Sequence, residues 1–382
     1  MTTIIKTAEA QDFLALVPHL TGFQPRHSIV LVAFRGNRTC GALRLDLPAA
    51  DAPPAVRRRA VTTMLGMICK IPGVDAIVPV VYTDDAFGPG GAIPHRSVVG
   101  DVLSRARYSG FLVRDALCVA SDAWGSYLDD SCPPGGRPLS LIVASPALGT
   151  FARTAPQRPL VDVDAESRLP AADVESRERT ATRYTTLESL RGTPELGAAV
   201  VFDHGFTGDV VGFAERLIAA GGGPVSPRDA ALLAFFVQAP ALRDEVLLTW
   251  AWGPKFGATV GDLNERHNAG EDISGLPGAM ALGGFDMPRP ETNRLESAIR
   301  LLRYTIPRLP RRAQAPLITM LAWAHWALGS GTISSRWVAQ ARALDPNHGL
   351  AELLERMLQG GRLPDWAWEV PAGVTEGAAI EA

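Results

Sequence analysis

The most constraining stretch of the chain is a continuous apolar run, Ile29–Phe34, that follows a rigid turn. A run of this length, rich in β-branched residues, predicts a strand that is covered on both faces. Gly22 can adopt a positive φ angle, and Pro25 fixes its own φ and restricts the residue before it. The chain therefore enters the strand in a defined direction, with His27 and Ser28 at its entrance.

The rest of the N-terminal part alternates between strand and helix patterns. Gly36-Asn37 separates the first strand from a second one, which predicts a hairpin. The later alternation of strands and helices is typical of α/β folds. We therefore expect an N-terminal α/β domain at 1–148, with a mostly parallel sheet and an edge hairpin. The predicted strands are 29–34, 40–47, 76–82, 111–120 and 139–144, and the predicted helices are 8–17 (capped by Thr7), 54–70 and one that ends at Gly110.

The character of the chain changes at about residue 149. From 149 to 193 proline and arginine become frequent and the strand pattern ends, which predicts a charged linker with a polar helix around 172–190. Helical patterns then dominate 194–370, apart from glycine-rich 253–284, which we expect to be irregular. We predict an α-helical domain at 194–370 and a disordered tail at 371–382.

Charge and cysteine usage exclude several classes of protein. With a net charge of -3, the chain lacks the basic surplus that is typical of nucleic-acid-binding domains. It contains no apolar run of about 18 residues, as a membrane span requires, and its first residues lack the apolar core of a secretion signal. We expect Cys40, Cys69 and Cys118 to be buried, reduced thiols rather than parts of a disulfide or zinc frame. These features predict a cytoplasmic protein that binds neither nucleic acid nor membrane.

The sequence contains no catalytic motif that we can identify. It lacks a Walker A loop, a GxGxxG turn, an HExxH helix and a nucleophile elbow. The glycine-rich segments Gly88–Gly91 and Gly221–Pro224 are not followed by a lysine, which favours plain loops. His325 lies between Trp323 and Trp326 on an apolar helix, a setting more typical of a packing residue than of a ligand. The sequence leaves open whether the protein is an enzyme, and it points to no cofactor.

A group of polar residues is predicted at one edge of the sheet. If Gly36-Asn37 forms the loop of the hairpin, residues whose numbers sum to 73 face each other, and His27 lies opposite Asp46. Ser28 lies beside them at the start of the first strand. A longer loop would shift this register by one residue and turn His27 to the other face.

The next strands bring further polar residues to the same edge. A right-handed crossover makes the third predicted strand parallel to the one that ends at Asp46, so Asp84 and Asp85 follow its carboxyl end. If the fourth strand is also parallel, Asp122 and Trp124 arrive at this edge as well. Ligands of open α/β sheets bind outside the carboxyl ends of the strands.

Two interpretations of this edge remain open. Several carboxylates with a histidine can hold Mg²⁺, with Asp46 and Asp84 as candidate ligands, or can serve as general acid and base. Alternatively, the aspartates only stabilise turns by bonding to the nearby backbone. The residues of this candidate edge are His27, Ser28, Asp46, Asp84, Asp85, Asp122 and Trp124.

Two parts of the chain resemble a known family. One is Val17–Val30 with Leu43–Pro48, and the other is Leu321–Thr332 with Ala341–Pro346. In order and spacing they are similar to an actinobacterial family known only as domain of unknown function 4192. The resemblance spans nearly the whole chain. It implies a cytosolic bacterial protein whose family has no assigned activity.

The chain departs from the family pattern at one place. Members resemble a pattern in which a Trp-x-Ser-Tyr segment leads into several clustered cysteines, whereas Trp124–Tyr127 is followed here only by Cys132. A lone thiol cannot form a metal cluster. Any metal-binding or redox role of those cysteines in the family would therefore be lost in this protein.

The helical half of the chain offers a second indication of function. Ala324, Gly329, Ala341 and Leu344–Pro346 resemble one helix pair of the tetratricopeptide repeats, of which at least about three are needed for an autonomous solenoid. We therefore expect a non-enzymatic interaction or regulatory protein with a protein partner. The alternative is a metal- or phosphate-dependent, hydrolase-like enzyme that uses the candidate edge.

Overall fold

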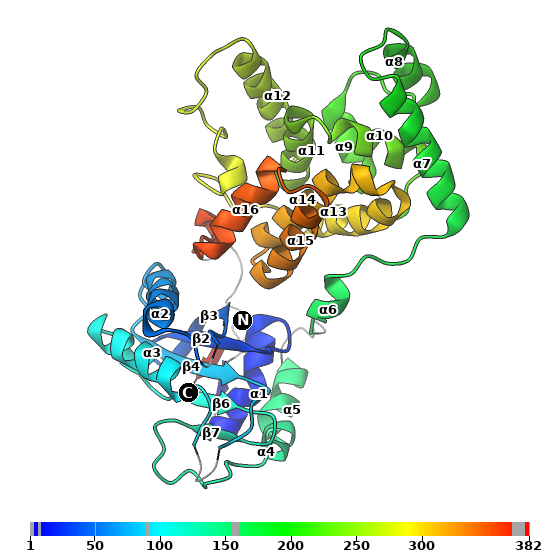
Figure 1. The fold of residues 1–382 in the computed structure, drawn as a ribbon. Helices are drawn as coiled ribbons and strands as arrows, with labels where there is room; N and C mark the ends of the chain where they lie inside the picture. Colours follow the sequence, from blue (N-terminus) through cyan, green and yellow to red (C-terminus); the bar gives the residue numbers. More distant parts are fainter. Residues whose placement is uncertain are drawn as a thin grey trace. The chain divides into compact units, whose positions relative to one another are not determined.

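The computed structural model describes residues 4–6, 9–49, 51–88, 92–154, 160–219, 221–368 and 379–381 (Figure 1). The chain forms two compact units. The α/β unit comprises Met1–Asp162 and Val370–Ala382, and the helical unit comprises Val163–Glu369. None of the described helices combines the length and the apolar character that a membrane crossing needs.

A single mixed sheet forms the centre of the α/β unit. Its strands lie in the order β1-β8-β3-β2-β4-β6-β7, and β5 pairs with β4. Strand β2 is buried along its whole length except at Arg35, which explains why its sequence is apolar on both faces. The strands are β1 (Ile4–Lys6), β2 (Ser28–Arg35), β3 (Arg38–Asp46), β4 (Ala76–Tyr82), β5 (Leu112–Val113), β6 (Leu117–Val119), β7 (Trp124–Ser126) and β8 (Ala379–Glu381).

The prediction of a mostly parallel sheet is wrong. Strand β2 pairs antiparallel with both β3 and β4, and β6 pairs antiparallel with β7, while β4 pairs parallel with β5 and β6. The error concerns which strand of the hairpin lies beside β4. The apolar β2 needs a neighbour on each side to be buried, whereas β3 is partly exposed. As predicted, β3 and β4 run in the same direction, but β2 lies between them.

The hairpin has the predicted two-residue loop but not the predicted register. The two strands pair directly across Gly36-Asn37. A β-bulge then leaves Cys40 without an opposite residue, so the register shifts by one. As a result Ser28, and not His27, pairs with Asp46.

Helices cover both faces of the sheet, as the alternation of strand side chains requires. Helices α1 (Ala10–Thr21), α4 (Ser140–Val143) and α5 (Pro146–Thr154) cover one face, which we call the α1 face (Figure 1). Helices α2 (Pro54–Ile68) and α3 (Arg96–Tyr108) cover the other face. The buried even-numbered residues of β2 and β4 pack on the α1 face, and the odd-numbered ones pack under α2 and α3.

Several short elements of this unit differ from the predicted ones. Residues 139–144, predicted as a strand, contain helix α4, and the predicted strand 111–120 is divided into β5 and β6. Strands β1 and β7, of three residues each, were not predicted because so few residues carry no clear alternation. The predicted cap Thr7 lies outside the described residues, and α1 begins at Ala10.

The C-terminal tail takes part in the sheet. Residues 371–382 were predicted to be disordered, but Ala379–Glu381 form β8, which pairs with β1 and with Arg38 of β3. The remaining residues of the tail lie outside the described part of the chain. Strand β8 pairs with β3 only at Arg38, the first residue of β3, and such backbone pairing needs no long apolar run.

The predicted linker at 149–193 is shared between the two units. Its first residues belong to α5, which packs on α1, while α6 (Val163–Glu166) and α7 (Val174–Ser189) belong to the helical unit. Helix α7 lies where a polar helix was predicted, but it packs against the core of the helical unit. Tyr184 and Leu187 are buried in the core because the few apolar residues of α7 fall on one face.

The helical unit is built around α14 (Gln314–Ala327). All residues from Ala315 to Ala327 are buried. A helix that is enclosed on every side cannot line an open groove, so α14 with α15 does not offer the peptide groove of a tetratricopeptide repeat. The other helices are α8 (Glu195–Ala198), α9 (Val210–Ala219), α10 (Pro227–Phe236), α11 (Pro240–Trp252), α12 (Pro254–Asn268), α13 (Thr292–Thr305), α15 (Gly331–Leu344) and α16 (Gly349–Gln359).

The region 253–284, predicted to be irregular, begins with the regular helix α12. Its glycines suggested a loop, but Gly257 has a packing role. A Cβ atom there would lie 2.0 Å from Oγ1 of Thr249 on α11. The glycine therefore allows α11 and α12 to approach closely, and the polar segment Asn264–Asn268 forms the end of α12.

The four cysteines are free. Cys118 is buried and Cys40 is partly buried, whereas Cys69 is exposed, so the prediction that Cys69 is buried is wrong. Cys69 follows the last residue of α2 and forms its C-cap.

Candidate functional site

The predicted residues of the candidate edge lie in, or next to, one row of paired residues that crosses the sheet. His27 precedes β2 and Asp84 follows β4, and because these strands are antiparallel neighbours the two residues meet. His27 Nε2 lies 2.7 Å from Asp84 Oδ2. The row itself consists of Asp46, Ser28, Tyr82, Val119 and Trp124, on β3, β2, β4, β6 and β7.

A second histidine, His95, joins this edge beside Asp85. Its Nε2 atom lies 3.0 Å from Asp85 Oδ2 and 3.2 Å from the hydroxyl of Thr83. The sequence patterns did not single it out, although its place directly before α3 returns it to the edge where β4 ends. His27 and His95 have φ angles of 43° and 56°, a region that residues other than glycine rarely occupy.

Two of the predicted aspartates are engaged elsewhere. Asp46 accepts a hydrogen bond of 2.5 Å from Arg44. Among the described residues, no hydrogen bond joins its carboxylate to the imidazole of His27. The main chain of His27 is nevertheless near, since its carbonyl accepts a hydrogen bond from Leu47. Asp122 accepts a hydrogen bond of 3.1 Å from the backbone of Phe87. Asp122 therefore braces the loop after β4, as turn chemistry predicts.

Ser28 and Trp124 are not available at the open edge. Their side chains point to the α1 face, and the two residues are 0% and 2% exposed. The guanidinium of Arg137 lies 5.3 Å from the ring centre of Trp124. Of the seven predicted residues, the edge thus brings together His27, Asp84 and Asp85, with His95 added.

The arrangement at this edge suits proton transfer better than metal binding. Within the described residues, no three histidine, cysteine, aspartate or glutamate side chains gather as metal ligands would. The two candidate ligands, Asp46 and Asp84, face Arg44 and His27 instead. A carboxylate that orients an imidazole is a common arrangement for a general base.

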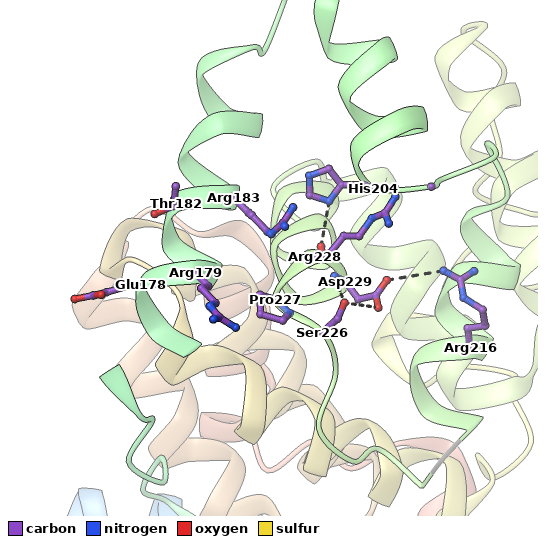
Figure 2. A pocket seen from close by; sticks show the side chains of 11 residues that line it. Glu178, Arg179, Thr182, Arg183, His204, Arg216, Ser226, Pro227, Arg228 and Asp229 are labelled. Atoms are coloured by element: carbon purple, nitrogen blue, oxygen red, sulfur yellow. Dashed lines mark hydrogen bonds and ion pairs between the residues drawn. The ribbon is translucent and has the colours of Figure 1, made fainter. Parts of the chain in front are cut away.

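A second candidate site, in the helical unit, is a pocket of about 950 Å³ (Figure 2). Four arginines line it, and they come from three helices, α7, α9 and α10. We call it the arginine pocket. Its lining consists of Glu178, Arg179, Thr182, Arg183, His204, Gly205, Arg216, Ser226, Pro227, Arg228 and Asp229.

The first turn of α10 forms one wall of the arginine pocket. Ser226 is the N-cap, and its Oγ accepts a hydrogen bond of 3.1 Å from the backbone of Asp229. Pro227 occupies the first helical position, where it needs no backbone donor. The positive end of the helix dipole of α10 therefore adds to the charge of the arginines.

The surroundings of His204 indicate the electrostatic potential in the arginine pocket. Its Nδ1 atom lies 3.2 Å from the carbonyl oxygen of Arg228 (Figure 2). Burial is the main cause that lowers the pKa of His204, and the charges of Arg183 and Arg228 act in the same direction, against the hydrogen bond to the Arg228 carbonyl. A neutral histidine between guanidinium groups marks a region of positive potential in a chain whose net charge is -3.

Gly205 makes room for one of these arginines. It has a φ angle of 59°, and an added Cβ atom would lie 2.9 Å from a terminal nitrogen of Arg228. The sequence analysis did not identify the arginine pocket, because its cations are spread from residue 179 to residue 228. The local signals were the spacing of Arg179 and Arg183 by one helical turn and the Ser226 cap.

A comparison with known protein families found a match that covers most of the chain. The family model of a domain of unknown function, DUF4192, matches residues 11–259 and 289–365, and so covers both units. No curated protein and no solved structure matches the chain. The protein is therefore a member of the DUF4192 family.

Proposed function

We propose that the protein is a non-enzymatic, ligand-binding regulator whose helical unit binds a phosphate-bearing small molecule in the arginine pocket. The observation that carries this proposal is the gathering of four arginines around about 950 Å³ of open volume. A pocket of this size can hold a nucleotide-sized ligand. Guanidinium groups bind phosphate through paired, charge-assisted hydrogen bonds, which makes arginine the preferred residue for such ligands.

The charges in the pocket leave a positive surplus for a ligand. The four arginines face two acidic side chains, Glu178 and Asp229. Arg179 also pairs with Glu175, and Arg216 lies 4.0 Å from Asp229. These pairs are exposed and therefore weak, so a phosphate can replace them at little cost. In Figure 2 the side chain of Arg183 points into the pocket from α7.

Binding is supported over catalysis because the reactive groups of the pocket have structural partners. The Ser226 hydroxyl caps α10 and donates to Asp229 at 2.8 Å. One nitrogen of His204 faces a backbone carbonyl, and burial disfavours its protonation. With Nδ1 donating to this carbonyl, the Nε2 atom of His204 keeps its lone pair, but a hydroxyl nucleophile needs its base within hydrogen-bond reach, and among the described residues Ser226 bonds to Asp229 and not to His204.

We further propose that the protein is cytosolic and acts on a protein partner. The four free cysteines fit a reducing compartment. A regulator that binds a small ligand must act on a second macromolecule, and the net charge of -3 favours a protein over nucleic acid. The helical unit would change its affinity for that partner when the arginine pocket is filled.

Calorimetric titration of the full chain with inorganic pyrophosphate and with ATP tests this proposal. We expect both ligands to bind, and Arg183→Gln and Arg228→Gln each to weaken binding by about tenfold to a hundredfold, since a hydrogen bond to a charged group contributes about 1.5–3 kcal/mol. The control is Arg177→Gln, which makes the same charge change on α7 at an exposed position outside the pocket. Equal losses in the control and in the two pocket variants would show that only net charge matters, and the proposal would fail.

A second candidate function is a hydrolase-like enzyme that uses the candidate edge. The observation in its favour is the pair of histidine–aspartate contacts, at 2.7 Å for His27–Asp84 and 3.0 Å for His95–Asp85. Turnover of p-nitrophenyl acetate and p-nitrophenyl phosphate, with and without Mg²⁺, tests it. Activity that is lost in His27→Gln and kept in the exposed control His267→Gln would favour the enzyme. Activity that survives both substitutions would exclude the His27–Asp84 pair as its source, and activity that also survives His95→Gln would exclude the candidate edge.

A further inference from the structure

We propose that a cavity on the α1 face of the α/β unit binds an uncharged, mainly apolar small molecule. The cavity has a volume of about 360 Å³ and lies under α1, α4 and α5, beside β4 and β6. This volume is within the range of about 300–1,000 Å³ that is typical of small-molecule sites. The proposal concerns another unit and another class of ligand than the arginine pocket does, and it does not depend on that pocket.

The lining of the cavity is dominated by apolar side chains. Nine of its twelve residues are apolar, among them Leu14 and Pro18 of α1, Ile142 of α4 and Leu148 of α5. The other three are His19, Gln24 and Tyr82. Apolar walls with a small number of polar groups are the usual construction of a site for a small organic molecule, in which the polar groups orient the ligand.

The ligand must be uncharged because nothing in the described lining would neutralise it. The lining contains no aspartate, glutamate, lysine or arginine. Burial lowers the pKa of His19, whose ring packs against Phe151 at a centroid distance of 4.4 Å. His19 is therefore neutral near pH 7. An ionised group in such a cavity would lose its hydration without gaining a partner.

The polar residues of the lining limit the ligand to one or two polar atoms. Gln24 is exposed and His19 is partly buried, so both can bond to a carbonyl or hydroxyl group. Two apolar residues of the lining, Val143 and Leu160, are 77% and 37% exposed. Exposed apolar side chains around a concave apolar surface are typical of a ligand site. Ketones, esters and lactones of medium chain length have the required chemistry.

The test compares 2-nonanone with nonanoate by calorimetric titration of the full chain at pH 7.5. The two probes have the same chain length and differ in charge, because a carboxylate is ionised at this pH. We expect 2-nonanone to bind and nonanoate to bind at least about tenfold more weakly. Ala15→Leu fills the cavity and should weaken the binding of 2-nonanone by about tenfold or more. Its control is Ala55→Leu, the same enlargement at an exposed position of α2.

Three outcomes would overturn the proposal. They are the absence of 2-nonanone binding, nonanoate binding that equals that of the ketone, and an Ala15→Leu variant that binds 2-nonanone as the Ala55→Leu control does. If Ala15→Leu does not fold, Leu148→Phe enlarges another residue of the lining, on α5, and the same comparison applies. Selective binding of the ketone that either cavity-filling variant removes would support the proposal.

Discussion

The imidazole of His27, at the entrance of β2, lies 2.7 Å from the carboxylate of Asp84, two residues beyond the end of β4. Both side chains are largely exposed, at 67% and 75%. An ion pair in this setting contributes only about 0–1 kcal/mol to stability. Yet His27 holds a φ angle of 43°, which disfavours any residue with a Cβ atom. Strain of this kind at a weakly stabilising contact is found at functional sites more often than elsewhere.

The strain at His27 leads to a first prediction. His27→Gly should leave the free energy of unfolding unchanged or raise it, because the relief of about 1–2 kcal/mol of strain offsets the loss of the ion pair. His27→Ala should lower it, because the strain remains while the pair is lost. Urea denaturation followed by circular dichroism measures both variants. An alanine variant at least as stable as the glycine variant would contradict the argument.

A second prediction concerns the potential in the arginine pocket. The pKa of His204 should lie below its usual value in the free protein, because burial and the nearby charges of Arg183 and Arg228 disfavour the protonated ring. Arg183→Gln should raise this pKa, and so should saturating pyrophosphate, because each reduces the positive potential. Titration of the histidine ring signals by NMR measures the change, with His325 in the core as internal reference. A pKa of His204 that does not respond to pyrophosphate would show that the anion binds elsewhere.

The meeting of His27 and Asp84 could be predicted from the sequence, and their exact neighbours could not. Strand directions follow from the hairpin and the connection through α2, so the ends of β3 and β4 had to lie at one edge. The bulge at Cys40 has no signal in the Gly36-Asn37 loop, and it shifted the partner of Asp46 by one residue. The central place of β2 did have a signal, since a strand without polar residues on either face needs two neighbours.

The arginine pocket was beyond sequence reasoning because tertiary packing creates it. Arg216 and Arg228 lie on different helices from Arg183, and only the packing of α7 against α10 and of α9 nearby brings them together. The glycines of 253–284 led to a wrong prediction of irregular structure for a related reason. Gly257 is a loop signal by composition, yet in the fold it is a contact point between two helices. Local patterns indicate which elements form, but not which of their surfaces meet.

That contact point provides a third prediction. Gly257→Ala should lower the free energy of unfolding by about 1–3 kcal/mol, because the new methyl group overlaps Oγ1 of Thr249. Gly261→Ala, one turn further along α12, should raise it by about 0.5–1 kcal/mol, because the nearest atom is the flexible end of Glu245 at 3.4 Å. Chemical denaturation followed by tryptophan fluorescence compares the two. Equal effects would mean that α12 adjusts its position freely against α11.

A fourth prediction concerns the pH dependence of stability. Burial and, to a smaller extent, the nearby charge of Arg303 lower the pKa of His325 to about 4. The unfolded chain therefore takes up the proton first, and stability is lost as the pH falls from about 6.5 towards 4. Between pH 7.5 and pH 5, His325 should account for a loss of about 2 kcal/mol.

The variant His325→Met should lack this part of the pH dependence, while the exposed control His267→Gln should keep it. Tryptophan fluorescence is a suitable readout, because all of the eight tryptophans except Trp124 belong to the helical unit. If His325→Met loses stability between pH 7.5 and pH 5 as steeply as the unmodified protein, protonation of His325 is not linked to unfolding.

The last prediction compares two buried tyrosines of the α/β unit. The hydroxyl of Tyr82 is enclosed on the α1 face and has no hydrogen-bond partner among the described residues. The hydroxyl of Tyr127 donates to the carbonyl oxygen of Pro94 at 2.5 Å. An enclosed hydroxyl without a partner costs about 1–3 kcal/mol, whereas a satisfied one contributes about 1 kcal/mol. Tyr82→Phe should therefore raise the free energy of unfolding, and Tyr127→Phe should lower it by about 1 kcal/mol.

Urea denaturation measures the free energy of unfolding of both variants. Because each variant loses the same single oxygen atom, differences in size or hydrophobicity cannot explain changes of opposite sign in this free energy. If both variants are destabilised, the hydroxyl of Tyr82 is bonded in solution, by a water molecule for example, and is not an unpaired group.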